Sequence, residues 1–123
     1  MSSTIKDAFF SYNWSIKDKV KQLSDNLEKQ NITVWRDEIN LETNDKPLTS
    51  QLADAIKNSK IFICFVTINY CKSFNCNLEF EYANSLAKPM IVLMIERLLP
   101  VDISDIIITG RGYHTGIGFI IKY

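Results

Sequence analysis

The chain has no excess of charge of either sign. Its 14 Lys and Arg residues balance 14 Asp and Glu residues, so that the formal net charge at pH 7 is zero. A protein that binds the phosphate backbone of a nucleic acid needs a strongly basic face. The sequence shows no such basic cluster, and nucleic acid is therefore not expected as a main partner. A net charge near zero instead favours self-association.

Long apolar runs and histidine are also scarce. No apolar run approaches the ~20 residues of a membrane span, and residues 1–7 lack the apolar core of a signal peptide. The sequence therefore predicts a domain without a membrane segment. His114 is the single histidine and has no evident partner in the sequence. A Ser-His-Asp or Cys-His nucleophile is accordingly not expected.

Cysteine is limited to Cys64, Cys71 and Cys76. An odd number in a chain of 123 residues, which is long enough to bury its own core, indicates reduced thiols and a cytoplasmic location. Cys64 stands inside an apolar run and is interpreted as a small buried hydrophobe. No second cysteine pair or histidine cluster completes a metal site, and no glycine-rich phosphate loop is present. Neither a metal nor a cofactor is predicted.

Short apolar runs alternate with helical patterns along most of the chain. Runs typical of buried strands cover residues 8–11, 32–35, 61–66 and 90–95. Their alternation with helices, joined by right-handed crossovers, predicts an α/β domain with a parallel sheet of four to five strands and helices on both faces. A single domain of this size over residues 1–123 favours the flavodoxin-like strand order 2-1-3-4-5.

Three helices are predicted between these strands. The first has Ser15 as its N-cap and runs to about Gln30. The second and third are defined by apolar residues at i, i+4 and i+8, namely Leu48, Leu52, Ile56 and Leu78, Tyr82, Leu86. Residues 67–75 are expected to form a loop. Beyond Glu96 the pattern is too weak to assign elements.

Polar residues follow the first and third strands. In an open parallel sheet, ligands bind beyond the carboxyl ends of the strands, at the point where the strand order reverses. Here that point lies between the strands that end at Ser11 and Val66. A helix that opens near Asn77 would bring Glu79 to the same edge. The sequence therefore predicts a ligand site in this place.

The segment from Arg36 to Leu48 is polar and longer than the few residues that usually join a strand to a helix. Loops of this length are often functional.

Several segments together resemble the Toll/interleukin-1 receptor (TIR) domain family over residues 6–96. Phe9-Phe10-Ser11-Tyr12 is similar to the first TIR box, and residues 32–37 with Leu41 are similar to the second strand and the start of the BB loop. Residues 55–61 resemble the passage into the third strand. The stretch usually written Tyr…Ser…Trp-Cys-x-x-Glu is matched by Tyr70, Ser73, Asn75, Cys76 and Glu79.

The resemblance implies intracellular signalling, in innate immunity or cell death, through homotypic association of TIR domains. The BB loop would dock on a neighbouring TIR domain, with contacts from Arg36, Asp37, Glu42, Asn44, Asp45, Lys46 and Pro47. Some members also cleave NAD between nicotinamide and ribose, and some cyclise the product. In those, one glutamate at the start of the third helix is essential, and by motif position it is Glu79. The implied substrate contacts are Ser11, Tyr12, Asn13, Trp14 and Glu42.

Two functions stay open from the sequence. In one, NAD is a substrate of a hydrolase or cyclase centred on Glu79. In the other, the domain is a non-catalytic interaction module, and Glu79 is structural, since an acidic residue near a helix N-terminus is stabilised by the helix dipole. Members without known catalysis often keep a glutamate here.

Three departures from the family pattern matter. Asn75 replaces the usual Trp beside Glu79, and the BB loop lacks its customary glycine, for which Asn44 is the expected substitute. The sequence also ends near Tyr123, before the last helix of most TIR domains, which predicts a fragment or a minimal member. A response-regulator function is set aside, because the first and third strands do not end in acidic residues.

Overall fold

The computed structural model describes residues 5–36, 50–95 and 118–122. They contain a five-stranded sheet in which every pairing is parallel and the strand order is β2-β1-β3-β4-β5. The predicted flavodoxin-like α/β fold is therefore confirmed. The strands are β1 (Lys6–Ser11), β2 (Val34–Trp35), β3 (Ser59–Val66), β4 (Met90–Met94) and β5 (Gly118–Lys122).

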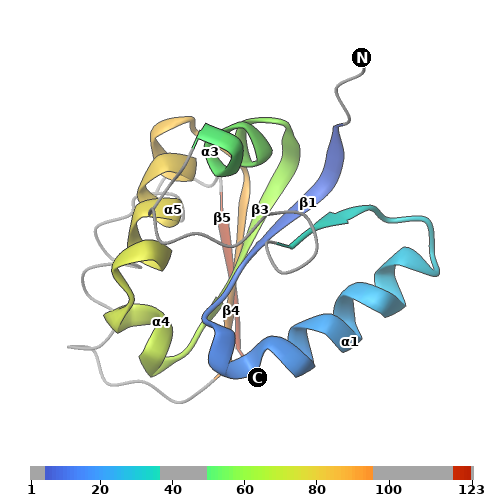
Figure 1. Ribbon diagram of the computed structural model, residues 1–123, viewed down its shortest axis with the longest axis horizontal. Coiled ribbons are helices and arrows are strands. Elements are labelled where there is room, and N and C mark those ends of the chain that lie inside the picture. The colour runs from blue at the N-terminus through green and yellow to red at the C-terminus, as the bar shows by residue number, and fades with distance from the viewer. Residues whose placement is uncertain (1–4, 37–49, 96–117, 123) are drawn as a thin grey trace.

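Helices cover both faces of the sheet (Figure 1). The short 3-10 helix η1 (Trp14–Ile16) leads into α1 (Lys17–Glu28), which packs on one face. The other face is covered by α3 (Ser50–Lys57), α4 (Ile68–Lys72) and α5 (Phe74–Ser85). None of the helices in the described part of the chain has the length and hydropathy needed to cross a membrane.

Alternation along β1 divides the core into two clusters, because successive strand residues point to opposite faces. Phe10 belongs to the cluster beneath α1, whereas Phe9 belongs to the cluster beneath α3, α4 and α5. The Phe9 ring stacks on Trp35 and on Phe62, with ring centroids 5.0 and 5.5 Å away. Phe62 in turn meets Phe80 edge-on at 6.3 Å. Aromatic contacts thus connect β2, β1, β3 and α5 in a single layer.

The predicted loop over residues 67–75 is wrong, because this segment contains α4 and the start of α5. The Thr67 side chain accepts a hydrogen bond from the backbone N–H of Tyr70 at 3.0 Å and caps α4. Ser73 caps α5 in the same way, accepting from the N–H of Cys76 at 3.2 Å. Hydroxyl side chains are preferred N-caps, and two of them here start two helices in close succession.

The third predicted helix is confirmed as α5, although it begins at Phe74 and not near Asn77. Leu86 is exposed and Leu78 is only half-buried, whereas the buried residues of α5 are Cys76, Glu79, Phe80 and Ala83. The two leucines that defined the spacing are therefore not the residues that α5 buries most deeply. The consequence is that Glu79 points into the protein.

The first helix begins differently from the prediction. Ser15 is not its N-cap. The Asn13 side chain instead accepts a hydrogen bond from the Ser15 N–H at 3.0 Å and caps η1. The α-helix then ends at Glu28, two residues before the predicted end. Of the second predicted helix, Leu52 and Ile56 are buried in α3, whereas Leu48 lies outside the described residues.

The Asp7 carboxylate joins β1 to the start of β2. Its Oδ2 accepts from the Thr33 N–H at 2.8 Å and from the Thr33 hydroxyl at 3.2 Å, and the Lys60 ammonium lies 3.2 Å from Oδ1. The hydrogen bond from the Thr33 backbone, followed by that from Lys60, lowers the pKa of Asp7. The charged form is therefore the one that holds this corner of the sheet together.

A pH dependence of stability follows for Asp7. Its pKa is lower in the folded than in the unfolded state, so its contribution to stability is complete above the ordinary aspartate pKa of about 3.9. That contribution is lost as the pH falls through the folded pKa. We expect the free energy of unfolding of Asp7→Asn, measured by urea denaturation across this acidic range, to fall less steeply with acidification than that of the wild type. Asp18→Asn, an exposed change on α1, is the control, and parallel curves for Asp7→Asn and the wild type would contradict the expectation.

Candidate functional site

Three polar side chains from β1, α4 and α5 meet near the carboxyl ends of β1 and β3. The Ser11 hydroxyl donates a hydrogen bond to Oε1 of Glu79 at 2.7 Å, and its oxygen lies 2.8 Å from the hydroxyl oxygen of Tyr70. All three residues are buried, with exposed fractions of 1% for Ser11, 0% for Tyr70 and 7% for Glu79. A carboxylate so placed is the strongest candidate for chemistry in the described part of the chain.

Local structure accounts for this meeting. Ser11 is the last residue of β1, and alternation places it on the same face as Phe9, toward α5. Tyr70 follows the Thr67 cap and packs in the cluster of that face. Glu79 lies one helical turn after Cys76 and one turn before Ala83, on the buried side of α5. The site therefore lies at the predicted switch point, between β1 and β3.

Burial sets the protonation of the groups around the carboxylate. It raises the pKa of Tyr70 well above its ordinary value, and the neighbouring Cys64, Cys76 and Glu79 raise it further. It also raises the pKa of the Cys64 thiol, which the Tyr70 hydroxyl offsets only in part. The phenol therefore stays protonated and able to donate. Cys64 stays a thiol, which is a poor nucleophile, in agreement with its interpretation as a buried hydrophobe.

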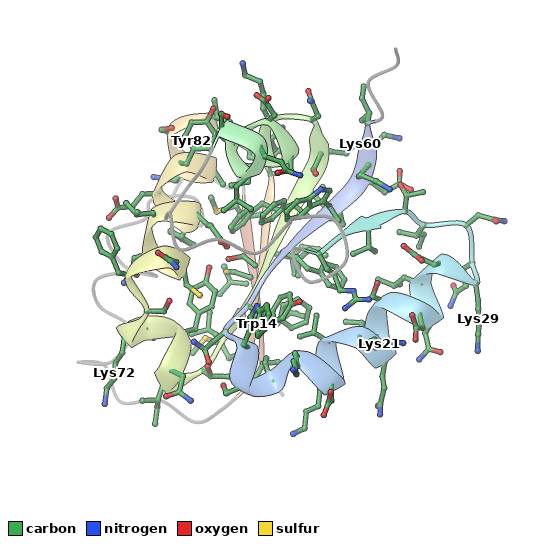
Figure 2. All side chains as sticks on the ribbon, viewed as in Figure 1. Trp14, Lys21, Lys29, Lys60, Lys72 and Tyr82 are labelled. Atoms are coloured by element: carbon green, nitrogen blue, oxygen red, sulfur yellow. The ribbon has the colours of Figure 1, made fainter. Side chains whose placement is uncertain are left out.

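The other described residues that were predicted to contact substrate differ in their burial and in the face of the sheet on which they lie. Tyr12 is buried on the opposite face, where its ring meets Phe65 edge-on at 6.4 Å. Asn13 caps η1. Trp14 is 53% exposed beside the carboxyl end of β1 (Figure 2), and the Lys17 ammonium lies 5.2 Å from its ring centroid. Trp14 is thus the accessible member of the group, whereas the Tyr12 ring is separated from Glu79 by the sheet.

The short helix η1, which carries Trp14, is joined to α4. The Asn69 amide donates a hydrogen bond to the Ser15 hydroxyl at 3.2 Å. The segments that follow β1 and β3 are thereby joined at the edge where Glu79 is found.

Most of the predicted BB-loop contacts lie outside the described residues. These are Asp37, Glu42, Asn44, Asp45, Lys46 and Pro47. Arg36 is described, and it is buried with only 2% of its surface exposed.

Tyr70 is the site residue that the sequence did not single out beyond its match to the family motif. Its role depends on α4, which was predicted to be loop. The available signal was the pair of hydroxyl residues, Thr67 and Ser73, spaced so that each caps a short helix. A helical turn after Thr67 is what directs the Tyr70 side chain toward the sheet.

A metal-binding group and a pocket would be the other possible ligand sites among the described residues. No group of three or more His, Cys, Asp or Glu side chains among them could hold a metal ion. A pocket of about 230 Å³ lies on the α1 face and is lined by Ile16, Lys19, Val20, Leu23, Phe65, Leu93 and Ile95. Its lining is apolar apart from Lys19 and contains no carboxylate, so the buried Glu79 remains the candidate site.

The open parallel sheet of strand order β2-β1-β3-β4-β5 places this protein in the class of flavodoxin-like domains. The buried Glu79 lies at the switch point of that sheet. The family model of the TIR domain matches residues 8–114. The chain belongs to the TIR domain family, as its motifs predicted.

Solved structures with this fold come from three settings. The TIR domain of a Toll-related receptor from Hydra magnipapillata has a TM-score of 0.65 and 19% identity, over 76% of this chain and 74% of that one. The TIR domains of the activated Roq1 resistosome, which recognises the pathogen effector XopQ, have a TM-score of 0.61 and 20% identity, over 74% of this chain and 59% of that one. The CMP N-glycosidase BcmB from Clostridium botulinum has a TM-score of 0.62 and 24% identity, over 96% of this chain and 89% of that one. No curated protein sequence matched the chain.

The burial of the thiols predicts their order of reaction. All three cysteines are free of disulfides, and only Cys71 is partly exposed, while Cys64 and Cys76 are buried. We expect iodoacetamide to alkylate Cys71 first in the native protein, because the thiolate is the reacting species and needs access to the reagent. Peptide mass spectrometry at increasing times measures this order, with unfolded protein as the control. Early modification of Cys64 would contradict the burial that protects it.

Proposed function

We propose that this chain is an intracellular TIR signalling domain whose Glu79 cleaves the N-glycosidic bond of a nucleotide, with NAD as its first substrate. The observation that supports this proposal is the buried Glu79 carboxylate, held by Ser11 at 2.7 Å beyond the carboxyl ends of β1 and β3. This is the place where open α/β sheets bind ligands. The family likeness, in which the corresponding glutamate is essential in NAD-cleaving members, supports the choice of this bond.

The chemistry suits a carboxylate in a site with little water. When the bond between C1′ of ribose and the nicotinamide nitrogen breaks, the nitrogen keeps the electron pair and the ribose gains oxocarbenium-like positive charge. A carboxylate fixed in a low-dielectric site stabilises that charge or adds to C1′. Water then supplies the hydroxyl group at C1′ and releases a proton. If another group of the same molecule attacked C1′ in place of water, the product would be a cyclic compound.

Two substrates need to be compared, because the fold is shared with a CMP N-glycosidase that aligns over 96% of this chain. Both reactions separate a base from C1′ of ribose. Nicotinamide leaves NAD as a neutral molecule, because its nitrogen carries a positive charge before the bond breaks. Cytosine leaves more readily after protonation by an acid. Burial raises the pKa of Tyr70, which is joined to Glu79 through Ser11, and also that of the Cys64 thiol beside Tyr70, so that both groups are weak acids. NAD is therefore the first choice and CMP the second.

The proposal predicts loss of cleavage in Glu79→Gln. This change keeps the size of the side chain and an acceptor oxygen for Ser11, but it removes the negative charge that stabilises the cation. We expect kcat for nicotinamide release to fall by roughly 10²- to 10³-fold. Chromatography of NAD and CMP reactions at high protein concentration provides the measurement.

Glu81→Gln is the matched control, because Glu81 lies on the same helix and is exposed. It should leave the rate unchanged. Release that survives Glu79→Gln would contradict the assignment of the carboxylate. Wild-type protein that is inactive on both nucleotides, even in assembled form, would leave the interaction module as the function.

Self-association of the domain through the BB loop is the second part of the proposed function. The TIR domains of the Roq1 resistosome belong to an assembly. In this chain a zero net charge removes long-range repulsion between copies, and the segment from Arg36 to Leu48 carries closely spaced charges of both signs. Contacts of this kind are individually small, so that a high local concentration would be needed for assembly.

The non-catalytic alternative is also supported by the hydrogen bond between Ser11 and Glu79. That bond connects the end of β1 to α5 and would stabilise the fold even if no nucleotide were cleaved. The distinction therefore lies in the charge of Glu79, which catalysis requires and a structural acceptor does not. Glu79→Gln removes the negative charge and keeps an acceptor oxygen for Ser11.

A charge exchange tests the proposed association. The double change Asp45→Lys with Lys46→Glu keeps the net charge at zero but reverses the charge order in the BB loop. We expect the weight-average mass of the wild type to rise above 14.2 kDa with concentration and that of the exchanged protein to stay near it. Light scattering after size-exclusion chromatography measures both masses.

The matched control exchanges Lys21 and Asp25, an exposed ion pair on α1 with 2.8 Å between its charged atoms. This exchange should leave association unchanged, and the acid-before-lysine order that it creates suits a helix. If both exchanges have the same effect, the interface does not include the BB loop.

A further inference from the structure

The hydrogen bonds of Ser11 form a directed chain. A serine hydroxyl carries one proton and can accept through its oxygen. Ser11 donates that proton to Oε1 of Glu79 at 2.7 Å. The 2.8 Å contact between Ser11 and Tyr70 can therefore form only if the phenol donates to the serine oxygen. The order is Tyr70 to Ser11 to Glu79.

We propose that Ser11 and Tyr70 are positioning residues that fix the Glu79 carboxylate in its reactive orientation, an inference that rests on the proposed N-glycosidic cleavage. The terminal torsion of a glutamate is broad and does not by itself fix the plane of its carboxylate. A charge-assisted bond from Ser11 to one oxygen restricts that plane. The Tyr70 hydroxyl contacts Ser11, and it acts on the orientation of the carboxylate through that contact.

Burial separates this role from substrate binding. Ser11 is 1% exposed and Tyr70 is fully buried, and their hydroxyls are engaged with each other and with Glu79, so that we assign neither to the nucleotide. Ser11 was predicted from the family likeness to contact substrate, whereas its hydroxyl proton is directed to Glu79. Loss of either hydroxyl should consequently lower kcat and leave KM nearly unchanged, because ground-state binding does not involve these groups.

The phenol is itself held in place by the backbone around it. The N–H of Tyr70 is bound by the Thr67 side chain at 3.0 Å, and the Tyr70 carbonyl accepts from the N–H of Ser73 at 3.1 Å. Its ring belongs to the cluster that includes Cys64 and Phe80. The Tyr70 hydroxyl, which is the first donor of the hydrogen-bond chain, is therefore held in place by α4 and by the core.

The kinetic test uses Tyr70→Phe, Ser11→Ala and the combination of the two. Tyr70→Phe removes a single oxygen, and we expect kcat for nicotinamide release to fall about tenfold. Ser11→Ala removes the direct donor and should cost about a hundredfold, as misplacement of a catalytic group does. Because Tyr70 acts through Ser11, the double variant should match Ser11→Ala alone. Ser11→Thr retains the hydroxyl and should recover most of the rate.

Two matched variants control for the loss of packing or stability. Tyr82→Phe removes the hydroxyl of a tyrosine that packs on the same cluster from the far end of α5 (Figure 2). Ser59→Ala removes a buried serine that donates to the Ala55 carbonyl at 2.7 Å, near the opposite end of β3. Both should keep the wild-type kcat. Equal losses in these controls would overturn the positioning role, as would a KM effect as large as the kcat effect.

The NMR resonance of the Glu79 carboxyl carbon provides a readout that needs no activity. It is assigned by its absence in Glu79→Gln. Ser11→Ala and Tyr70→Phe should both shift it, and the shift of the double variant should equal that of Ser11→Ala. Wild-type protein that cleaves neither NAD nor CMP would refute the proposed function, while an unmoved carboxyl resonance in Tyr70→Phe would refute the hydrogen-bond chain.

Discussion

The alternation of side chains along β1 is the constraint on which the rest of the structure depends. β1 lies inside the sheet, between β2 and β3, and is buried on both faces toward its carboxyl end. Each residue must therefore suit one particular cluster. Phe9 and Ser11 face α5, whereas Phe10 and Tyr12 face α1. A slip of one residue would exchange the two sets, so that the aromatic stack and the Ser11–Glu79 bond would be lost together.

The buried polar chain follows from the same constraint. A serine and a glutamate at the edge of an aromatic core are costly unless each finds a hydrogen-bond partner. Here Ser11, Tyr70 and Glu79 satisfy one another within a compact group contributed by three elements. Removal of the Ser11 hydroxyl would take a hydrogen-bond partner from both Tyr70 and Glu79. The hydrogen bonds that stabilise this buried group also orient the desolvated Glu79 carboxylate, as the proposed chemistry requires.

Neither family membership nor the fold identifies a reaction, which has to be argued from the side chains of the candidate site. TIR domains with related folds include a receptor domain and a resistosome, and a CMP N-glycosidase shares the architecture. One fold can host several functions, and the chemistry depends on particular side chains. The exposed Trp14 and the buried Glu79 are the two features of the described edge on which the proposed nucleotide binding rests. The first offers a ring to stack on and the second a charge.

The strand order and the place of the candidate site follow from the sequence pattern. Buried β-branched and aromatic runs, each followed by polar residues, specify parallel strands because only such strands are apolar on both faces. The switch point between β1 and β3 then follows from chain connectivity. The orientation of α5, the existence of α4 and the part played by Tyr70 were decided only by tertiary structure. The spacing of Leu78, Tyr82 and Leu86 indicated a helix, whereas the burial of Glu79 and Phe80 on that helix follows from its packing on the sheet. Local periodicity ranks the faces of a helix by hydropathy, whereas a buried hydrogen bond such as that between Ser11 and Glu79 depends on residues far apart in the sequence.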